Sequence, residues 1–333
     1  MEELPFEKIK RKILVKKESE TNNSYGTDPE NRTVKELINS GVICLNKSQG
    51  PTSHQTAEYV KNILNLKHVG HGGTLDPHVT GVLPIALENA TRITQTLLIA
   101  GKEYVALMHM HKPIDNKKIL NGFEEFKGKI KQLPPIRSAV KRQIREREIY
   151  YIEIIEMGNQ DVLFRIGCQA GTYIRKYISD FGNNLKTNAH MLQLVRTKAG
   201  PFNDKEMYTM QEIKDAYEYY KEGDESHLKK IIKPIEFATQ HLPKIWVQDT
   251  TVDSLCHGTD LSIPGISKLE SDIKKDDLVA VMTLKNELIC LGNVILTSEE
   301  IIKMERGKAV KTAKVFMKPD IYPKWKKQEV KVN

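Results

Sequence analysis

The 333-residue chain lacks any run of about 18 apolar residues, the length that a membrane-spanning helix requires. Its first residues, MEELPFEKIKRKILVKK, carry basic charge but lack the apolar core of a secretory signal peptide. These two absences argue against a membrane-spanning or secreted protein. We therefore expect a cytoplasmic protein.

Cysteine is scarce and dispersed. The four cysteines form no C-x-x-C pair and are Cys44, Cys168, Cys256 and Cys290. This spacing argues against a zinc knuckle and against a disulfide framework, so we expect buried free thiols. The chain also lacks a G-x-x-x-x-G-K-[ST] phosphate loop and metal-ligand spacing, so we expect no cofactor and no metal. His109 and His111 share a strand face, but no further ligand is nearby, which favours a structural role.

Positive charge is in excess and is clustered. The formal net charge is +8 and the sequence pI is near 9.0. Six cations lie in residues 8–17, five lie in 137–147, and others lie in the tail from Lys318 onward. Such clusters attract phosphate backbones, although solvated faces give the same pattern. Charge alone therefore leaves nucleic-acid binding open, and no strongly amphipathic helix supports membrane binding.

The length favours two domains, preceded by a polar extension over residues 1–40. Residues 41–240 mix strand-like and helical patterns, and Thr52 with Gln55 fits a capping box that begins a helix. The strand candidates there are rich in Val, Ile, Tyr and Phe and span 41–47, 102–110, 148–157, 161–169 and 189–197. A charged helix is expected over 210–232. From Lys244 the pattern predicts a short helix, two strands, a helix and a last strand, which form a β-rich domain over 241–333.

The most informative segment is HVGHGGTLDPHVTGVLPIAL, residues 68–87. Glycines 70, 72 and 73 permit unusual backbone angles and close approach of another chain. Pro77 moves Asp76 out of the helical region. We expect a carboxylate presented from a stiff loop and anchored by the apolar strand that follows, although an ordinary Asp-Pro turn has the same residues.

Five segments resemble, in the right order, those of the TruB-type pseudouridine synthases. HGGTLDPHVTGVLPIAL resembles the family's signature loop, whose aspartate before proline is the catalytic nucleophile. The other four are LNKSQGPTSH (45–54), GKEYVA (101–106), AGTYIRKYISDFG (170–182) and AHMLQLVRTKAGPF (189–202). The terminal unit is similar to a PUA domain, an RNA-binding fold. The resemblance covers residues 36–317.

One branch of the family fits best. Residues 130–154, the N-terminal extension and the full PUA-like unit resemble the archaeal homologue of dyskerin, the catalytic subunit of H/ACA guide-RNA particles. The resemblance implies a mixed α/β (α+β) fold with a central, mainly antiparallel sheet, a small β-rich PUA domain, and an extension that packs with that domain. The implied partners are guide RNA, rRNA, tRNA, Nop-type and Gar-type small proteins and a kink-turn-binding protein. Because 112–150 is short, it would be a poor RNA clamp by itself.

The implied reaction is an isomerisation in which the N1–C1′ bond of uridine breaks, the base turns, and C5 bonds to C1′. It requires an ionised nucleophile, and an ordinary aspartate, with a pKa of about 3.9, is already ionised at neutral pH. The site must therefore position the Asp76 carboxylate and exclude water from it, and it does not need a base to activate it. Attack on C1′, attack on C6 and a glycal-type elimination all remain open.

Two further catalytic residues follow from the resemblance. Arg175 matches the family arginine, and a guanidinium can hold a carboxylate through two parallel hydrogen bonds. Tyr104 matches the tyrosine that stacks on the extruded base. An ordinary helix-surface arginine and a sheet-core tyrosine would give the same local sequence, but the intact motifs favour catalysis.

Three residues are expected to bind the substrate. Leu194 lies where the family has an apolar residue against the base, although a core leucine would look the same. His71 corresponds to a family histidine near the flipped nucleotide, where a positioning hydrogen bond is expected rather than general-acid catalysis, although a solvent-facing loop histidine would look the same. Lys47, with the turn at Pro51–Thr52, is expected to shape the floor of the cleft.

Three functions are compatible with these residues. The first is the catalytic subunit of a guide-RNA particle that acts on rRNA and on the tRNA T-loop uridine. The second is a stand-alone tRNA T-loop pseudouridine synthase, which would share every catalytic residue. The third is a non-catalytic RNA scaffold, against which the intact set of Asp76, Tyr104 and Arg175 argues.

Overall fold

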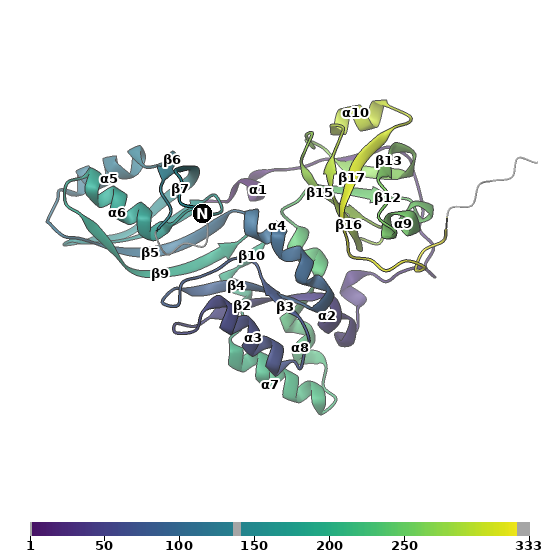
Figure 1. Ribbon diagram of the computed structural model, residues 1–333, viewed down its shortest axis with the longest axis horizontal. Helices are drawn as coiled ribbons and strands as arrows, with labels where there is room; N and C mark the ends of the chain where they lie inside the picture. The colour runs from purple at the N-terminus through teal and green to yellow at the C-terminus, as the bar shows by residue number, and fades with distance from the viewer. Residues whose placement is uncertain (1, 136–140, 325–333) are drawn as a thin grey trace, which may run out of the picture. The chain divides into compact units, whose positions relative to one another are not determined.

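The computed structural model describes residues 2–135 and 141–324 (Figure 1). The cation expected at position 137 and the basic tail beyond Lys324 lie outside these residues. The chain forms two compact units: unit 1 comprises Met1–Lys8 and Gly41–Lys233, and unit 2 comprises Ile9–Ser40 and Pro234–Asn333. No helix in the described ranges is long and apolar enough to cross a membrane.

Unit 1 is built on a ten-stranded sheet. Its main path runs β11, β2, β4, β9, β5, β8, β7, β6, with bounds Ile232–Pro234, Gly41–Lys47, Thr80–Leu87, Ala189–Ala199, Lys102–Met110, Asp161–Cys168, Arg145–Gly158 and Gly128–Gln132. β3 (Val69–His71) pairs with β4, and β10 (Phe202–Asn203) pairs with β9. β4 and β9 pair in parallel, whereas β2–β4, β5–β8, β5–β9 and β7–β8 pair antiparallel. The predicted mixed α/β fold with a mainly antiparallel sheet is confirmed.

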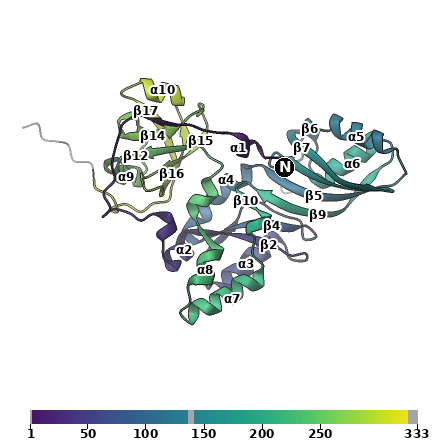
Figure 2. The same cartoon turned by 180° about the vertical axis from the view of Figure 1, so that it is seen from behind.

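Helices pack at both ends of this sheet. α5 (Asn116–Glu125) and α6 (Ile174–Asn184) lie together, with α6 beside β9, whereas α3 (Ser53–Ile63) and α7 (Met210–Lys221) lie together, with α7 beside β2 (Figures 1 and 2). α3 begins at the predicted capping box, in which the Gln55 amide N–H donates to Thr52 Oγ1 at 3.2 Å. The helix expected over 210–232 is broken into α7 and α8 (Ser226–Ile231), because Gly223 adopts a φ of +100°.

The core next to the candidate site lies between β5 and the two helices α5 and α6. Alternate residues of β5, namely Ala106, Met108 and Met110, are fully buried on one face. Phe123 of α5 and Phe181 of α6 stack against each other with ring centroids 4.5 Å apart. Burial of each such ring contributes about 1.5–3 kcal/mol to stability. This core gives the strand that carries Tyr104 and the helix that carries Arg175 a rigid support.

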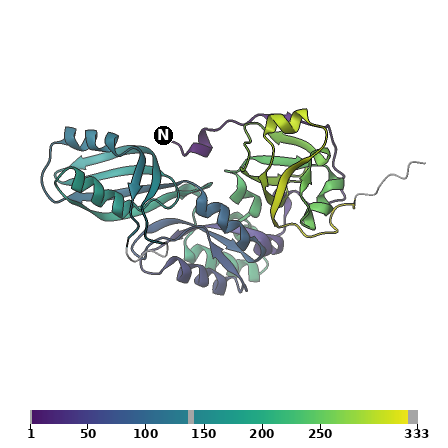
Figure 3. The ribbon, with the colours of Figure 1, turned by 45° about the horizontal axis from the view of Figure 1, so that its top comes forward.

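Unit 2 is a second, curved sheet (Figure 3). Its strand order is β1, β14, β12, β15, β16, β17, β13, with bounds Ile13–Val15, Ile266–Glu270, Lys244–Val247, Leu278–Met282, Leu288–Val294, Lys308–Val315 and Leu261–Ser262. Its helices include α2 (Val34–Ser40), α9 (Asp249–Cys256) and α10 (Ser298–Lys303). The sequence predicted a helix directly at Lys244, but strand β12 comes first. This strand has four residues, of which three are apolar, and such a segment is too short for its periodicity to distinguish a strand from a helix.

The N-terminal extension divides between the two units. In unit 2, β1 pairs antiparallel with β14, and Arg32 forms two hydrogen bonds of 2.8 Å to the carboxylate of Glu236. In unit 1, α1 (Pro5–Lys8) follows the fully buried Leu4, and Lys198 Nζ contacts Glu7 at 3.0 Å. The first eight residues therefore fold with unit 1 rather than with the PUA-like unit, because a buried leucine and an ion pair attach them there.

Candidate active site

The loop that carries Asp76 connects β3 to β4 and is held on both sides of the aspartate. The Leu75 amide N–H donates to Ser53 Oγ at 2.8 Å, and the Gly50 amide N–H donates to the Pro77 carbonyl at 2.9 Å. Gly73 has a φ of +135°, which a larger residue would adopt only with strain. The Asp76 side chain itself is 59 % exposed. The loop thus presents a carboxylate to solvent from a fixed backbone, as the sequence predicted.

Lys47 lies beneath this loop rather than in the cleft. Its side chain is fully buried, and Nζ lies 3.0–3.3 Å from four backbone carbonyl oxygens, those of Ser48, Asp76, Pro77 and Val79. Burial lowers its pKa, and the charge of Asp76 opposes that shift. The ammonium is thus surrounded by carbonyls and supports the loop from beneath, while the expected part of Lys47 in binding the substrate stays a prediction.

We expect Lys47→Met to lower the free energy of unfolding by about 2–5 kcal/mol, because it leaves buried carbonyls without a donor. Urea-induced unfolding measures this difference. Lys214→Met replaces an exposed lysine of α7 and is the matched control, expected to change stability by less than about 0.5 kcal/mol. Equal stability of the two variants would show that Lys47 does not support the loop.

Arg175 lies at the start of α6 and faces Asp76. Its Nη2 atom donates to Asp76 Oδ2 at 3.0 Å, although the two residues are 99 positions apart in the sequence. A single hydrogen bond forms, not the expected parallel pair, and the two side chains are 60 % and 59 % exposed. An ion pair this exposed contributes only about 0–1 kcal/mol to stability. Its geometry therefore orients the carboxylate more than it stabilises the fold.

Tyr104 and Leu194 lie on the neighbouring strands β5 and β9. Leu194 is 9 % exposed, and the partly buried Tyr104 packs against the same hydrophobic cluster, which also contains Leu75 and Val79 of the Asp76 loop. Burial raises the pKa of Tyr104, and the charge of Asp76 contributes in the same direction. The aromatic ring, the leucine and the carboxylate are thus gathered around one place on the sheet.

His71, the last residue of β3, is partly buried, and its Nδ1 atom has no hydrogen-bond partner. Burial lowers its pKa, and the positive charges of Arg196 and His54 lower it further. Its folded pKa is therefore below the ordinary value of about 6.5, so the ring is neutral at neutral pH. A neutral ring with a free nitrogen suits a positioning hydrogen bond better than general-acid catalysis.

Two buried cations near the loop were not identified from the sequence. Arg196 is 1 % exposed and lies within the matched segment 189–202. Lys102, at the start of β5, donates to the carbonyls of Leu97, Leu98 and Ala100 at 2.6–3.0 Å. Burial lowers the pKa of Lys102 to about 7, although three carbonyl acceptors at a helix end favour the charged form. No local pattern marked either cation, because β9 also contains Lys198 and β5 begins with Lys102 and Glu103.

The histidine pair has more neighbours than the sequence indicated. His190 of β9 lies 2.8 Å from His111 (Nδ1 to Nε2), and Asp161 Oδ1 lies 2.6 Å from His109 Nδ1. The expectation that no further ligand is nearby was therefore wrong, because cross-strand pairing brings these residues together. Over residues 2–135 and 141–324, however, no group of three such side chains is arranged to hold a metal ion. All four cysteines are free, with Cys256 half-buried and the other three buried.

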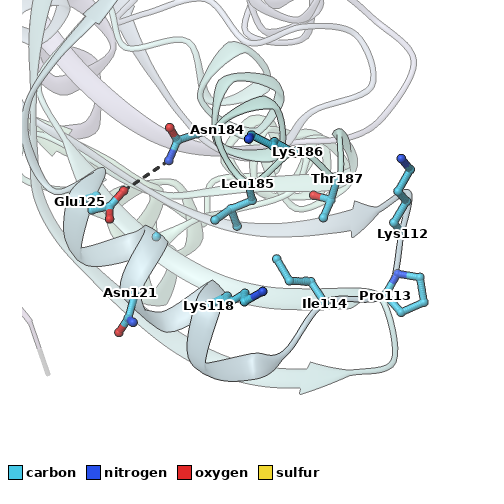
Figure 4. Close-up of a pocket in the computed structure, with 11 residues that line it drawn as sticks. Lys112, Pro113, Ile114, Lys118, Asn121, Glu125, Asn184, Leu185, Lys186 and Thr187 are labelled. Carbon is cyan, nitrogen blue, oxygen red and sulfur yellow. Dashed lines mark hydrogen bonds between the residues drawn. The ribbon is translucent and has the colours of Figure 1, made fainter.

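A pocket of about 540 Å³ lies away from Asp76 (Figure 4). It is lined in part by Lys112, Lys118 and Lys186, and the Asn184 amide donates to Glu125 Oε2 across one side at 3.3 Å. Asn184 is the last residue of α6, and Arg175 is near its first. At 1.5 Å per residue the two ends are roughly 14 Å apart. The pocket is therefore separate from the carboxylate site.

Family models match nearly the whole chain. The TruB family pseudouridylate synthase N-terminal domain matches residues 61–174, and the tRNA pseudouridylate synthase B C-terminal domain matches 175–240. A PUA domain matches 243–316, and a DKCLD (NUC011) domain matches 1–57. The first two models together contain Asp76, Tyr104, Arg175 and Leu194.

Curated proteins and solved structures agree with these models. The chain is 51 % identical over 325 residues to the probable tRNA pseudouridine synthase B of Pyrococcus furiosus (96 % of each chain). It is 50 % identical to that of Methanopyrus kandleri (96 % and 95 %). Among structures, it resembles a chain of a Cbf5-Nop10-Gar1 complex, with 51 % identity, a TM-score of 0.93 and coverage of 97 % and 98 %. A chain of an H/ACA RNP bound to a substrate RNA containing 2′-deoxyuridine matches at 48 % identity and a TM-score of 0.91 (97 % and 99 %).

Proposed function

The chain belongs to the TruB family of pseudouridine synthases, and from this premise we propose that it is the catalytic subunit of an H/ACA guide-RNA particle that acts on rRNA and on tRNA. The observation that carries the catalytic part is the 3.0 Å contact between Arg175 and Asp76 beside Tyr104. The likeness over nearly the full chain to proteins of H/ACA complexes supports the assembly part. A non-catalytic scaffold would not need an aligned, exposed carboxylate.

In the proposed mechanism, an unpaired uridine turns out of its RNA stack, and its base lies against Tyr104 and Leu194. Asp76 approaches the sugar and base as the nucleophile, and Arg175 orients its carboxylate. The N1–C1′ bond breaks, the base rotates, and a C5–C1′ bond forms. C5 then loses its proton and N1 carries one, so that the product has the composition of the substrate. His71 contributes a hydrogen bond that positions the nucleotide.

The two ends of the chain have different proposed roles. Residues 41–240 carry out the reaction, and residues 241–333, together with most of residues 1–40, bind RNA. The proposed partners are guide RNA, a Nop-type and a Gar-type small protein and a kink-turn-binding protein, and the proposed location is the cytoplasm. Complexes of similar chains with Nop10, Gar1 and substrate RNA support these partners.

A stand-alone tRNA enzyme is the second candidate, favoured by the names of the curated relatives. The deciding assay maps pseudouridine in labelled rRNA and tRNA fragments with the pure protein, then with guide RNA and partners added in turn. The proposal expects site-specific conversion of rRNA only in the complete mixture. Fast, site-specific rRNA conversion by the protein alone would contradict guide dependence, and conversion of tRNA alone in every mixture would favour the second candidate.

We expect exposed lysines of β17 to contribute phosphate contacts. Lys308 and Lys311 are both exposed on this strand. If each contacts one phosphate, Lys308→Ala/Lys311→Ala should lower the slope of log affinity against log salt by about 2. Filter binding at several salt concentrations measures the slope. Lys274→Ala/Lys275→Ala, which removes two other exposed lysines of unit 2, is the control, and equal slopes in the two variants would refute the assignment.

A further inference from the structure

Arg196 is the bulkiest of the fully buried side chains in the described parts of the chain, and its hydrogen-bond partners there are two backbone carbonyls and Tyr104 rather than a carboxylate. Its Nε atom donates to the Val82 carbonyl at 2.7 Å, and Nη2 donates to the Gly73 carbonyl at 3.1 Å. Gly73 and Val82 lie on either side of Asp76 in the chain. One guanidinium therefore joins the beginning of the Asp76 loop to the strand that follows it.

The same guanidinium reaches Tyr104. Arg196 and Tyr104 are direct partners in the antiparallel pairing of β9 with β5, so their side chains emerge on the same face, with Cβ atoms about 5 Å apart. The pairing is bulged immediately next to them, between Glu103 and Tyr104. Such bulges redirect side chains and recur beside active sites. Burial raises the pKa of Tyr104, while the charge and hydrogen bond of Arg196 oppose that rise.

The surroundings explain why a charged group occupies this position. Burial of a guanidinium without partners costs several kcal/mol of folding free energy. In this protein the cost is offset by hydrogen bonds to the Val82 and Gly73 carbonyls and to Tyr104. Gly81 pairs with Arg196 so closely that a Cβ there would lie 2.3 Å from the Arg196 carbonyl oxygen. Loop, strand and arginine are therefore packed without space for independent movement.

We propose that Arg196 is a positioning residue whose guanidinium connects the hydroxyl of Tyr104 to the loop that carries Asp76. The two groups act on different parts of one nucleotide, because the ring stacks on the base while the carboxylate reaches the reacting bond. Their separation must therefore stay fixed while the base turns. The planar guanidinium of arginine has several donors and can bind three acceptors at once in a fixed arrangement. The ammonium of lysine, at the end of a flexible side chain, cannot hold the three acceptors in the same arrangement. The inference rests on the proposed function of the site.

The test compares Arg196→Lys with Arg165→Lys. Arg165 lies on β8, which β5 separates from β9, and it contacts Glu153 and Glu103. It pairs with Val105, so its side chain is on the face of the sheet opposite to Tyr104, and it supplies the same substitution in the same sheet. In single-turnover assays with a saturating complete particle, we expect Arg196→Lys to convert uridine at least about tenfold more slowly, since misplacement of reacting groups by 1 Å can cost about 10²-fold. RNA affinity should change less than about twofold, and Arg165→Lys should match the wild type in both measurements.

A spectroscopic measurement separates positioning from a general loss of structure. With ¹³Cζ-labelled tyrosine, the Tyr104 resonance is identified by its absence in Tyr104→Phe. It should shift in Arg196→Lys and stay in place in Arg165→Lys, while the other tyrosine resonances remain unchanged in both variants. Arg196→Gln, which removes the charge, should shift the Tyr104 resonance further than Arg196→Lys does. If the glutamine variant does not fold, the comparison of Arg196→Lys with Arg165→Lys is sufficient for the test.

Each result has one meaning. Slower conversion together with a displaced Tyr104 resonance supports the proposal. A wild-type rate in Arg196→Lys, or an unmoved Tyr104 resonance despite slow conversion, overturns it. If the wild-type protein converts no uridine in any mixture, the proposed function fails instead, and this outcome is distinguishable because it does not depend on Arg196.

Discussion

We expect Asp76→Asn to reduce pseudouridine formation by at least about 10³-fold, since removal of an enzyme's nucleophile can cost on the order of 10⁶-fold. The substitution keeps the size of the side chain and its ability to accept a hydrogen bond from Arg175, but it removes the negative charge. Because the side chain is 59 % exposed, stability should change by less than about 0.5 kcal/mol. Single-turnover conversion of a defined RNA measures the effect.

RNA binding provides the internal control for this variant. Affinity arises mainly from cationic surfaces, so the dissociation constant of Asp76→Asn should stay within about twofold of the wild type. Asp161→Asn makes the same substitution at another exposed aspartate of unit 1 and should retain full activity. Turnover by Asp76→Asn at a tenth of the wild-type rate would show that the nucleophile is a different group.

Arg175→Lys should have the second-largest effect, a loss of on the order of 10²-fold in single-turnover rate. Lysine keeps the charge but loses the planar group that aims the carboxylate. The contact in the free protein is one hydrogen bond between two exposed groups, so the free energy of unfolding should change by less than about 1 kcal/mol. A bound RNA would exclude water from the ion pair and strengthen the attraction between Arg175 and Asp76. The substitution should therefore lower the reaction rate more than the stability of the fold.

Urea unfolding and rate measurements on the same preparation separate these two effects. A stable but slow Arg175→Lys variant agrees with an orienting role, and Arg165→Lys again supplies the matched substitution. A fast Arg175→Lys variant would mean that the loop alone aims Asp76. A variant that is both slow and strongly destabilised would assign Arg175 a structural role.

The sequence predicted those parts of the site whose signal is local. The glycine-rich loop, the proline after Asp76 and the capping box at Thr52 each specify the backbone within a few residues. The resemblance then paired Asp76 with Arg175, a contact across 99 positions that no local pattern contains. Strand β5 lies at the predicted bounds, 102–110, because its residues alternate between a buried and a less buried face.

The parts that could not be predicted depend on tertiary packing. Lys102 and Arg196 were not identified, since their acceptors are mainly backbone carbonyls, which every residue has. Lys47 was expected at the floor of the cleft, and only its burial and its four carbonyl acceptors show that it lies beneath the Asp76 loop. The division of the first 40 residues between two units was equally hidden, because it depends on Leu4 and Glu7 finding partners far along the chain.

The connectivity of the two units has a consequence for how the protein is made. Unit 2 takes one strand from the beginning of the chain and the others from its end, and Ile13 pairs with Glu270. A ribosome adds about 5–20 residues per second, so β1 waits on the order of tens of seconds for its partner. During this time unit 1, which ends at Lys233, is synthesised completely and can fold first. Closure of such a long loop is slow, so completion of unit 2 is expected to be the late step of biogenesis and the stage at which the nascent protein most needs protection from aggregation.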